Sequence, residues 1–323
     1  MKKILLAVIF LIIYNSVKAD DFPVSGTIGS FLKVNKGTKS SGMADAYTSI
    51  RSGTESIYGN PACFSKETKN EISLKYVSLF EEVSLNSISF LTPFSFGNFG
   101  FSFSYLNYGS LEKRDENDVL SGSFSPYDLV GIISYARDIT ESISLGANLK
   151  GFSEIIEEYS FSSIVFDVGC LIDVGSLTGI SDEEELFGGI VIQNVGMDAK
   201  GFRMPINIKS GLSYKLYGLL TEKPREVKTS VKGKMLKDTK KETEDVLISA
   251  LNLDFPLNGK TGFSLGVEYL YQFIGFRVGY RLGGLTGLTL GTTIKIFDSE
   301  INYAFIPSGD LGLIHNISLN YNF

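Results

Sequence analysis

Charged side chains recur on the polar face of many short alternating segments in this sequence. Five basic ones among them are candidates for binding a ligand: Lys150, Lys209, Arg277, Arg281 and Lys295. A lysine ammonium or an arginine guanidinium can bind a carboxylate group through charge-assisted hydrogen bonds. The same face carries acidic residues that could pair with the basic groups instead: Asp167, Asp173, Asp254 and Glu268. Both uses stay open, and for each basic residue taken singly we slightly favour pairing.

Other reactive side chains are few. His315 is the only histidine, and the sequence has no G-x-S-x-G motif that would accompany a Ser-His-Asp triad. It also has no phosphate-binding loop of the Walker type and no Cys/His set with the spacing of metal ligands. We expect no disulfide between Cys63 and Cys170, because we assign Cys170 to the lipid-facing surface and Cys63 to the interior. The sequence predicts neither an enzyme nor a cofactor.

The elements that must position the charged residues are β-strands. From residue 70 onward, apolar and polar residues alternate with a period of two, which places the apolar side chains of a strand on one face. In "FGFSFSY", Phe99, Phe101 and Phe103 share one face, and the glycine and serines between them share the other. We count fourteen such segments: 70–80, 83–93, 98–108, 127–138, 141–153, 161–175, 186–197, 205–217, 246–257, 262–272, 274–283, 287–297, 299–306 and 313–323.

Two architectures produce this alternation: a soluble sandwich with one wet face, or a transmembrane barrel with lipid outside and a polar interior. The charges distinguish them. The apolar face stays free of charge over segments of nine to eleven residues, and a charge facing lipid would cost about 2–4 kcal/mol near the membrane midplane. We therefore predict an all-β, transmembrane, antiparallel up-and-down β-barrel of about fourteen strands. In one segment the alternation shifts near Asn86, which we interpret as a β-bulge.

The first residues indicate export. Lys2 and Lys3 precede an apolar run, and a small-x-small cleavage site ends at Ala19, as in a secretory signal peptide. We assign residues 1–19 to that peptide, with a retained membrane anchor as the alternative. The whole chain has a formal net charge of −6, which argues against nucleic acid as a partner.

The chain ends in the alternating segment "HNISLNYNF", which places Tyr321 and Phe323 on one face. A final strand closing on phenylalanine looks like the outer-membrane assembly signal of Gram-negative barrels. That likeness implies the cell outer membrane as the location, with its lipid and the barrel-assembly machinery as partners. An ordinary final strand is the alternative interpretation.

Residues 20–69 do not alternate, and we predict that they form a small N-terminal hatch inside the barrel, because a large barrel leaves a lumen to fill. The turn Asn60-Pro61-Ala62 would end this hatch and support a gate: proline fixes φ, asparagine can bond its own backbone, and alanine is small. The barrel then covers residues 70–323. A charged loop, residues 221–245, interrupts it.

Two stretches carry a resemblance to a known family. "FLKVNKGTKSSGMADAYTSI" with "ESIYGNPACFS" resembles the N-terminal signature of the PorV/PorQ family of outer-membrane proteins, and "INYAFIPSGDLGLIHNISLNYNF" is similar to the ending of that family. The sequence departs from the family pattern at Cys63 and Phe64, where Gly and Leu are usual. The family is in turn similar to FadL, a fourteen-stranded importer of long-chain fatty acids whose hatch also carries Asn-Pro-Ala.

The resemblance implies passive transport of hydrophobic small molecules, such as long-chain fatty acids, across the outer membrane. The five basic residues named first would then line the lumen and meet a carboxylate head. The alternative is a PorV-like protein that handles exported proteins, with secretion partners at the outer membrane. A purely structural or adhesive barrel is less favoured, because the predicted outer loops are mostly short.

Overall fold

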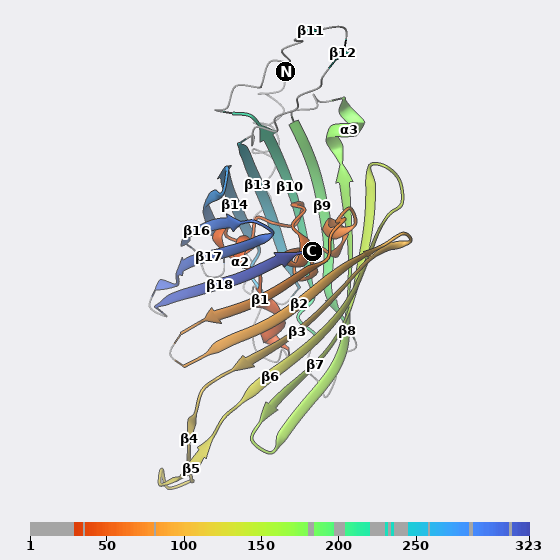
Figure 1. Cartoon of the computed structure of the whole chain (residues 1–323). Coiled ribbons are helices and arrows are strands. Elements are labelled where there is room, and N and C mark those ends of the chain that lie inside the picture. The colour runs from red at the N-terminus through yellow and green to blue at the C-terminus, as the bar shows by residue number, and fades with distance from the viewer. Residues whose placement is uncertain are drawn as a thin grey trace.

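The computed structural model describes residues 29–34, 36–80, 82–179, 184–196, 204–219, 230–231, 234–235, 245–257, 259–283, 287–309 and 312–323. Within them, fourteen antiparallel strands close into a barrel (Figure 1). These are β1 (Glu71–Ser78), β2 (Ser84–Phe94), β3 (Gly97–Asn107), β6 (Tyr127–Asp138), β7 (Ile143–Ile156), β8 (Tyr159–Asp173), β9 (Glu184–Val195), β10 (Asn207–Tyr217), β13 (Val246–Pro256), β14 (Gly262–Tyr271), β15 (Ile274–Leu282), β16 (Gly287–Ile296), β17 (Ser299–Pro307) and β18 (Leu313–Asn322). Each coincides with a predicted segment, so the predicted barrel is confirmed.

The remaining elements are short. Two further hairpins pair β4 (Leu111–Arg114) with β5 (Leu120–Phe124) and β11 (Ser230–Val231) with β12 (Lys234–Met235). The helices are η1 (Ser30–Lys33), α2 (Thr38–Gly42), η2 (Gly53–Ile57), η3 (Pro61–Phe64) and α3 (Val174–Thr178). In the described part of the chain, none of these helices has the length and apolarity needed to cross a membrane.

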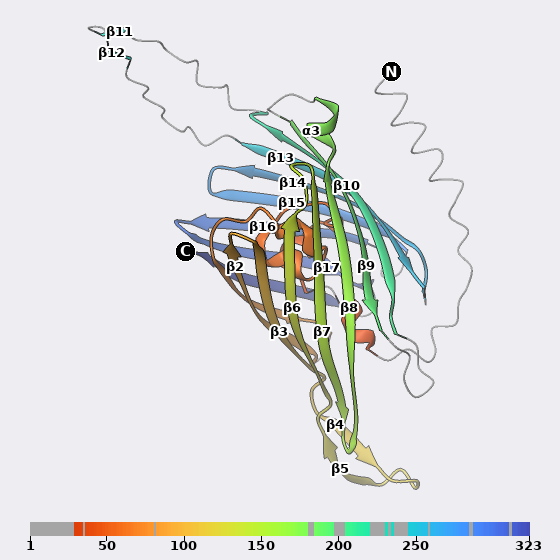
Figure 2. The ribbon, with the colours of Figure 1, turned by 90° about the vertical axis from the view of Figure 1, so that its right-hand side faces the viewer.

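The two ends of the barrel differ. We call the end where β1 begins and β18 stops the terminal end, and the opposite end the loop end. The β4–β5 hairpin projects from the loop end, and α3 lies at the terminal end (Figure 2). The predicted charged loop joins β10 to β13, the eighth and ninth barrel strands, at the terminal end. Most of that loop and the predicted signal peptide lie outside the described residues.

The alternation of the sequence sorts side chains between the two faces of the wall. In β3, Phe101 and Phe103 are 43% and 50% exposed, whereas Ser102 and Ser104 are buried. Pairing of β1 with β18 closes the ring, so no strand of the ring leaves an unpaired edge, as a structure crossing lipid requires. A closed wall whose exterior is apolar along the middle of its strands is the surface of a membrane-spanning barrel.

The predicted bulge in β2 is wrong. The strand pairs without a register shift along its whole length with β3, and from Ser84 to Leu91 with β1. The alternation only seemed to shift because Leu85 and Leu91 point inward and are fully buried in an apolar cluster inside the barrel. Apolar residues that face the interior can therefore make the apolar–polar alternation of a regular strand look shifted in the sequence.

A register shift does occur between β8 and β9, where Phe166 pairs with Val195 and Val168 with Ile192. The extra residue lies on β9, as in a β-bulge. Asn194 there has a φ of 59°, and its backbone N–H donates to the Asp167 carboxylate at 2.8 Å. A buried acid on one strand thus stabilises the irregular backbone of its neighbour.

Residues 36–70, which we call the inner segment, occupy the interior of the barrel, where they are drawn in orange in Figure 1. Helix α2 contacts β15–β18, η2 contacts β1–β3, and η3 contacts β6–β8. The segment therefore spans the lumen from wall to wall. Its side chains Met43, Ile57 and Phe64 are fully buried.

Candidate functional site

The turn Asn60-Pro61-Ala62 lies against the barrel wall. The Asn60 side chain accepts a hydrogen bond from the Ala62 N–H at 3.1 Å and caps η3, in which Pro61 takes the first position. The Asn60 amide nitrogen donates to the Thr48 carbonyl at 2.9 Å and to the Cys170 carbonyl of β8 at 3.0 Å. One asparagine therefore joins three segments: its own turn, an earlier part of the inner segment, and the wall.

Cross-strand pairs of glycine form the surfaces that receive the inner segment. Three such pairs occur in neighbouring strands: Gly146 with Gly169, Gly189 with Gly211, and Gly266 with Gly279. A Cβ on these glycines would collide with the inner segment: with Asn60 to Ala62 at the first pair, with Thr48 and Ser49 at the second, and with Met43 and Ala44 at the third. Glycine is needed here because two backbones approach closely.

Four of the five basic residues predicted to line the lumen are in ion pairs. Lys150 lies 2.6 Å from Asp167, and Arg277 lies 2.6 Å from Glu268. These two pairs are almost wholly buried, and the Arg277–Glu268 pair is a short charge-assisted hydrogen bond. Within the two pairs the basic charges are neutralised by wall residues, which is the use we favoured from the sequence.

Arg281 holds two carboxylates, Asp45 of the inner segment at 2.5 Å and Asp254 of β13 at 2.9 Å. Lys209 lies 3.8 Å from Asp254 and is partly exposed. Lys295 lies near the terminal end of β16 and is exposed. Of the acids named with them, Asp173 is the last residue of β8, at the terminal end, where it accepts the Ser176 N–H and caps α3.

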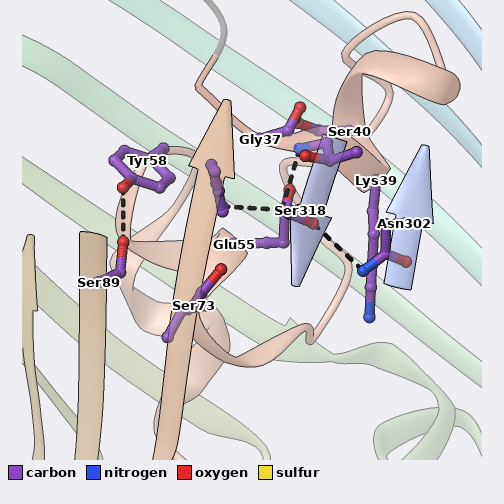
Figure 3. Close-up of polar contacts among 12 residues, drawn as sticks. Gly37, Lys39, Ser40, Glu55, Tyr58, Ser73, Ser89, Asn302 and Ser318 are labelled. Carbon is purple, nitrogen blue, oxygen red and sulfur yellow. Dashed lines mark hydrogen bonds and ion pairs between the residues drawn. The ribbon is translucent and has the colours of Figure 1, made fainter. Parts of the chain in front are cut away.

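Two further ion pairs join the inner segment to the wall, and the sequence analysis did not identify them. Lys75 of β1 lies 2.8 Å from Glu55 in a fully buried pair, and its ammonium lies 4.5 Å from the Tyr58 ring centroid. Lys39 of α2 lies 2.6 Å from Glu300. Figure 3 shows this side of the interior, with Tyr58 pointing to Ser89 of the wall. Because the inner segment lacks periodicity, its sequence gave no sign of which residues face the wall.

An apolar cavity of about 370 Å³ opens inside the barrel at the loop end. Its wall includes inward apolar side chains of four strands, namely Val77, Leu106, Ile306 and Ile314, and the η1 residue Phe31 also lines it. These residues belong to an apolar cluster that also contains Leu85, Val130 and Phe152. Such side chains break the apolar-out pattern of their strands. This break is the signal by which the sequence could have revealed the cavity.

A second, polar cavity of about 150 Å³ adjoins the apolar one. Four residues line both cavities: Lys33, Val34, Asp45 and Arg281. The polar cavity also reaches Lys36, Lys150 and Asn194. Together the two cavities form an interior site that is apolar at the loop end and charged toward the centre.

The predicted assembly residues lie at the terminal end. Tyr321 and Phe323 are exposed, and their rings stack with centroids 5.7 Å apart. Phe323 also exchanges two backbone hydrogen bonds with Asn70. His315 faces outward on β18, where its Nδ1 lies 2.8 Å from the Tyr303 hydroxyl.

Both cysteines are free, and Cys63 is buried. Burial raises the pKa of the Cys63 thiol to about 12, so it stays protonated at neutral pH. Within the residues that the structure describes, no three His, Cys, Asp or Glu side chains are grouped so that they could hold a metal ion.

No family model and no curated protein matches this sequence. Several solved structures share its fold. The toluene transporter TbuX of Ralstonia pickettii aligns with 89% of this chain and 98% of its own, at 13% identity and a TM-score of 0.54. The toluene transporter TodX of Pseudomonas putida aligns with 89% of this chain and 98% of its own, at 13% identity and a TM-score of 0.52. The monoaromatic hydrocarbon channel CymD covers 90% of this chain and 98% of its own, at 12% identity and a TM-score of 0.52.

Proposed function

We propose that this protein is an outer-membrane barrel through which hydrophobic small molecules, long-chain fatty acids foremost among them, pass without an energy source. The apolar cavity at the loop end is the observation that carries this proposal. Its volume falls within the range of about 300–1,000 Å³ that ligand pockets have, and apolar walls are typical of them. The fold shared with two toluene transporters and a hydrocarbon channel supports the same reading.

The inner segment would act as the hatch of this barrel. Its contacts with strands around the ring obstruct a straight water-filled path, so a ligand would have to enter beside it. The loop end would face the cell exterior and the terminal end the periplasm, with Asn60-Pro61-Ala62 supporting the part of the hatch that yields. Lipid and the barrel-assembly machinery remain the expected partners.

We also propose that the chain is a member of the PorV/PorQ family. Support comes from where its two N-terminal motifs lie: Met43 and Ala44 rest on one glycine pair, and the Asn-Pro-Ala turn rests on another. The motif residues thus have a shared packing role, which explains their types. A secretion role with exported proteins as partners remains the second prediction from that resemblance.

Uptake of labelled palmitate and toluene by cells producing the protein tests the transport proposal. Leu106→Glu places a charge in the wall of the apolar cavity, so we expect uptake of both compounds to fall about tenfold or more, because an unpaired buried charge is costly. Leu111→Glu is the matched control, since Leu111 is exposed on the β4–β5 hairpin outside the barrel. Uptake by the Leu106→Glu protein equal to the control, with normal heat-modifiable migration of both, would refute the proposal.

A further inference from the structure

Lys36 differs from the other buried lysines of the interior. Its side chain is only 4% exposed, and it lies in the inner segment just before α2. Its ammonium contacts the Phe31 carbonyl at 3.5 Å and lies 5.3 Å from the Phe31 ring centroid. None of the described carboxylates lies within ion-pair distance of it. Lys75 and Lys150, buried to the same degree, each have a carboxylate within 3 Å.

A buried ammonium without a carboxylate is costly, because burial removes its water and the carbonyl and ring of Phe31 replace only part of the lost hydration. The Lys36 pKa reflects this cost. Burial, and next the Lys150 ammonium, lower it to about 7, and Asp167 and Asp128 only partly oppose the change. An anion would therefore bind more favourably beside Lys36 than beside a lysine that already has a carboxylate partner.

Lys36 faces the polar cavity of about 150 Å³. Six basic and three acidic side chains line this cavity, and its basic excess favours a negatively charged guest. The polar cavity shares lining residues with the apolar cavity. A molecule with an acidic head and a hydrocarbon tail fits this arrangement, with its head in the polar cavity and its tail in the apolar cavity.

We propose that Lys36 binds the carboxylate head of an amphipathic ligand whose hydrocarbon tail occupies the apolar cavity. The inference rests on the proposed transport function and narrows its substrate class to long-chain carboxylates. It moves the head-group site from the wall residues expected from the sequence to the inner segment. The wall residues Lys150, Arg277 and Arg281 are occupied by carboxylates of the protein itself.

The test compares palmitate with hexadecanol, which has the same chain length and an uncharged head, in binding to the purified full-length protein. Lys36→Met keeps the length of the side chain and removes its charge. We expect its affinity for palmitate to fall about tenfold or more, the order expected for a hydrogen bond between charged groups. Its affinity for hexadecanol should stay within about twofold of wild type. Lys69→Met, which removes an exposed lysine at the terminal end, should change neither.

A second measurement needs no variant. The N-hydroxysuccinimide ester of palmitic acid should acylate the Lys36 amine, which attacks the ester carbonyl and releases N-hydroxysuccinimide. Peptide mass spectrometry locates the modified lysine. Free palmitate should protect Lys36 more strongly than hexadecanol does. Acylation confined to surface lysines would overturn the proposal.

The outcomes separate the two proposals. If wild type binds hexadecanol and palmitate, and Lys36→Met weakens neither or both equally, the role of Lys36 is overturned and transport of hydrophobic molecules stands. If wild type binds neither compound and takes up neither palmitate nor toluene, both proposals fall. Lys36→Arg keeps the charge and should retain most of the palmitate affinity.

Discussion

Two regions of the barrel interior hold the inner segment by different means. Along β7–β10 and β14–β15, backbone and a few short stretches of side chain lie directly on paired glycines. At the loop end, long apolar side chains fill the interior incompletely and leave a cavity of about 370 Å³. The glycine contacts hold the segment through close fit and a few hydrogen bonds to the wall, whereas the apolar region keeps a volume that a guest can occupy. The same wall thus combines tight backbone contacts in one region with an apolar cavity in another.

The largest effect is expected where a side chain is forced into the glycine contact. In Gly146→Val, the new side chain would collide with the Pro61 and Ala62 backbone, which has no flexible group that could move aside. We expect most of the inner segment to leave its seat, with a large rise in single-channel conductance in planar bilayers. Gly151→Val is the control on the same strand, because a Cβ at Gly151 meets nothing within 4 Å. Equal conductance of the two variants would show that the glycine pair does not seat the segment.

A smaller effect is expected at the buried ion pair between wall and inner segment. Lys75→Met leaves the Glu55 carboxylate buried without its partner, and such a loss typically costs about 3–5 kcal/mol. The midpoint of urea unfolding in lipid vesicles should fall accordingly. Lys113→Met breaks an exposed pair with Glu157, for which we expect a change of about 1 kcal/mol or less. If both substitutions shifted the midpoint by the same amount, the buried pair would not anchor the segment.

The smallest effect is expected at the turn that rests on the first glycine pair. Replacing both Asn60 and Pro61 with glycine removes hydrogen bonds to Ala62, Thr48 and Cys170 and loosens the chain. We expect a loss of about 1–3 kcal/mol in the docking of the segment. Ion leakage from liposomes should rise modestly and uptake of labelled palmitate should change, while heat-modifiable migration stays normal. If leakage and uptake both equal those of wild type, the turn only connects two parts of the chain and does not stabilise the docked segment.

The strands could be predicted because lipid imposes a strict rule on one face of each of them. Phe101 and Phe103 alternate with serines for that reason, and all fourteen strands followed from such patterns. The rule is relaxed on the inner face, where both polar and apolar residues are tolerated. Leu85 and Leu91 show the consequence: two inward apolar residues looked like a bulge.

The candidate site was predictable only in part. Charge alternation indicated that Lys150 and Arg277 share a face with acids, because both members of each pair lie on barrel strands. Lys36 and Glu55 lie in a segment without periodicity, so their neighbours are set by tertiary contacts that a single sequence does not reveal. The sequence alone indicated that the glycines of the wall lie on the polar face of their strands. Their pairing across strands was not, because it depends on register.

The hydrogen bonds between Asn70 and Phe323 bear on how the molecule folds. Asn70 is the last residue of the inner segment, so the final residue closes the ring beside the point where that segment continues into β1. The contact joins the strands farthest apart in the chain, and contacts of large sequence separation form slowly. We expect the ring to close last, around a segment already lying within the curved sheet. The segment would thus be enveloped as the wall assembles, with no need to thread through a finished pore.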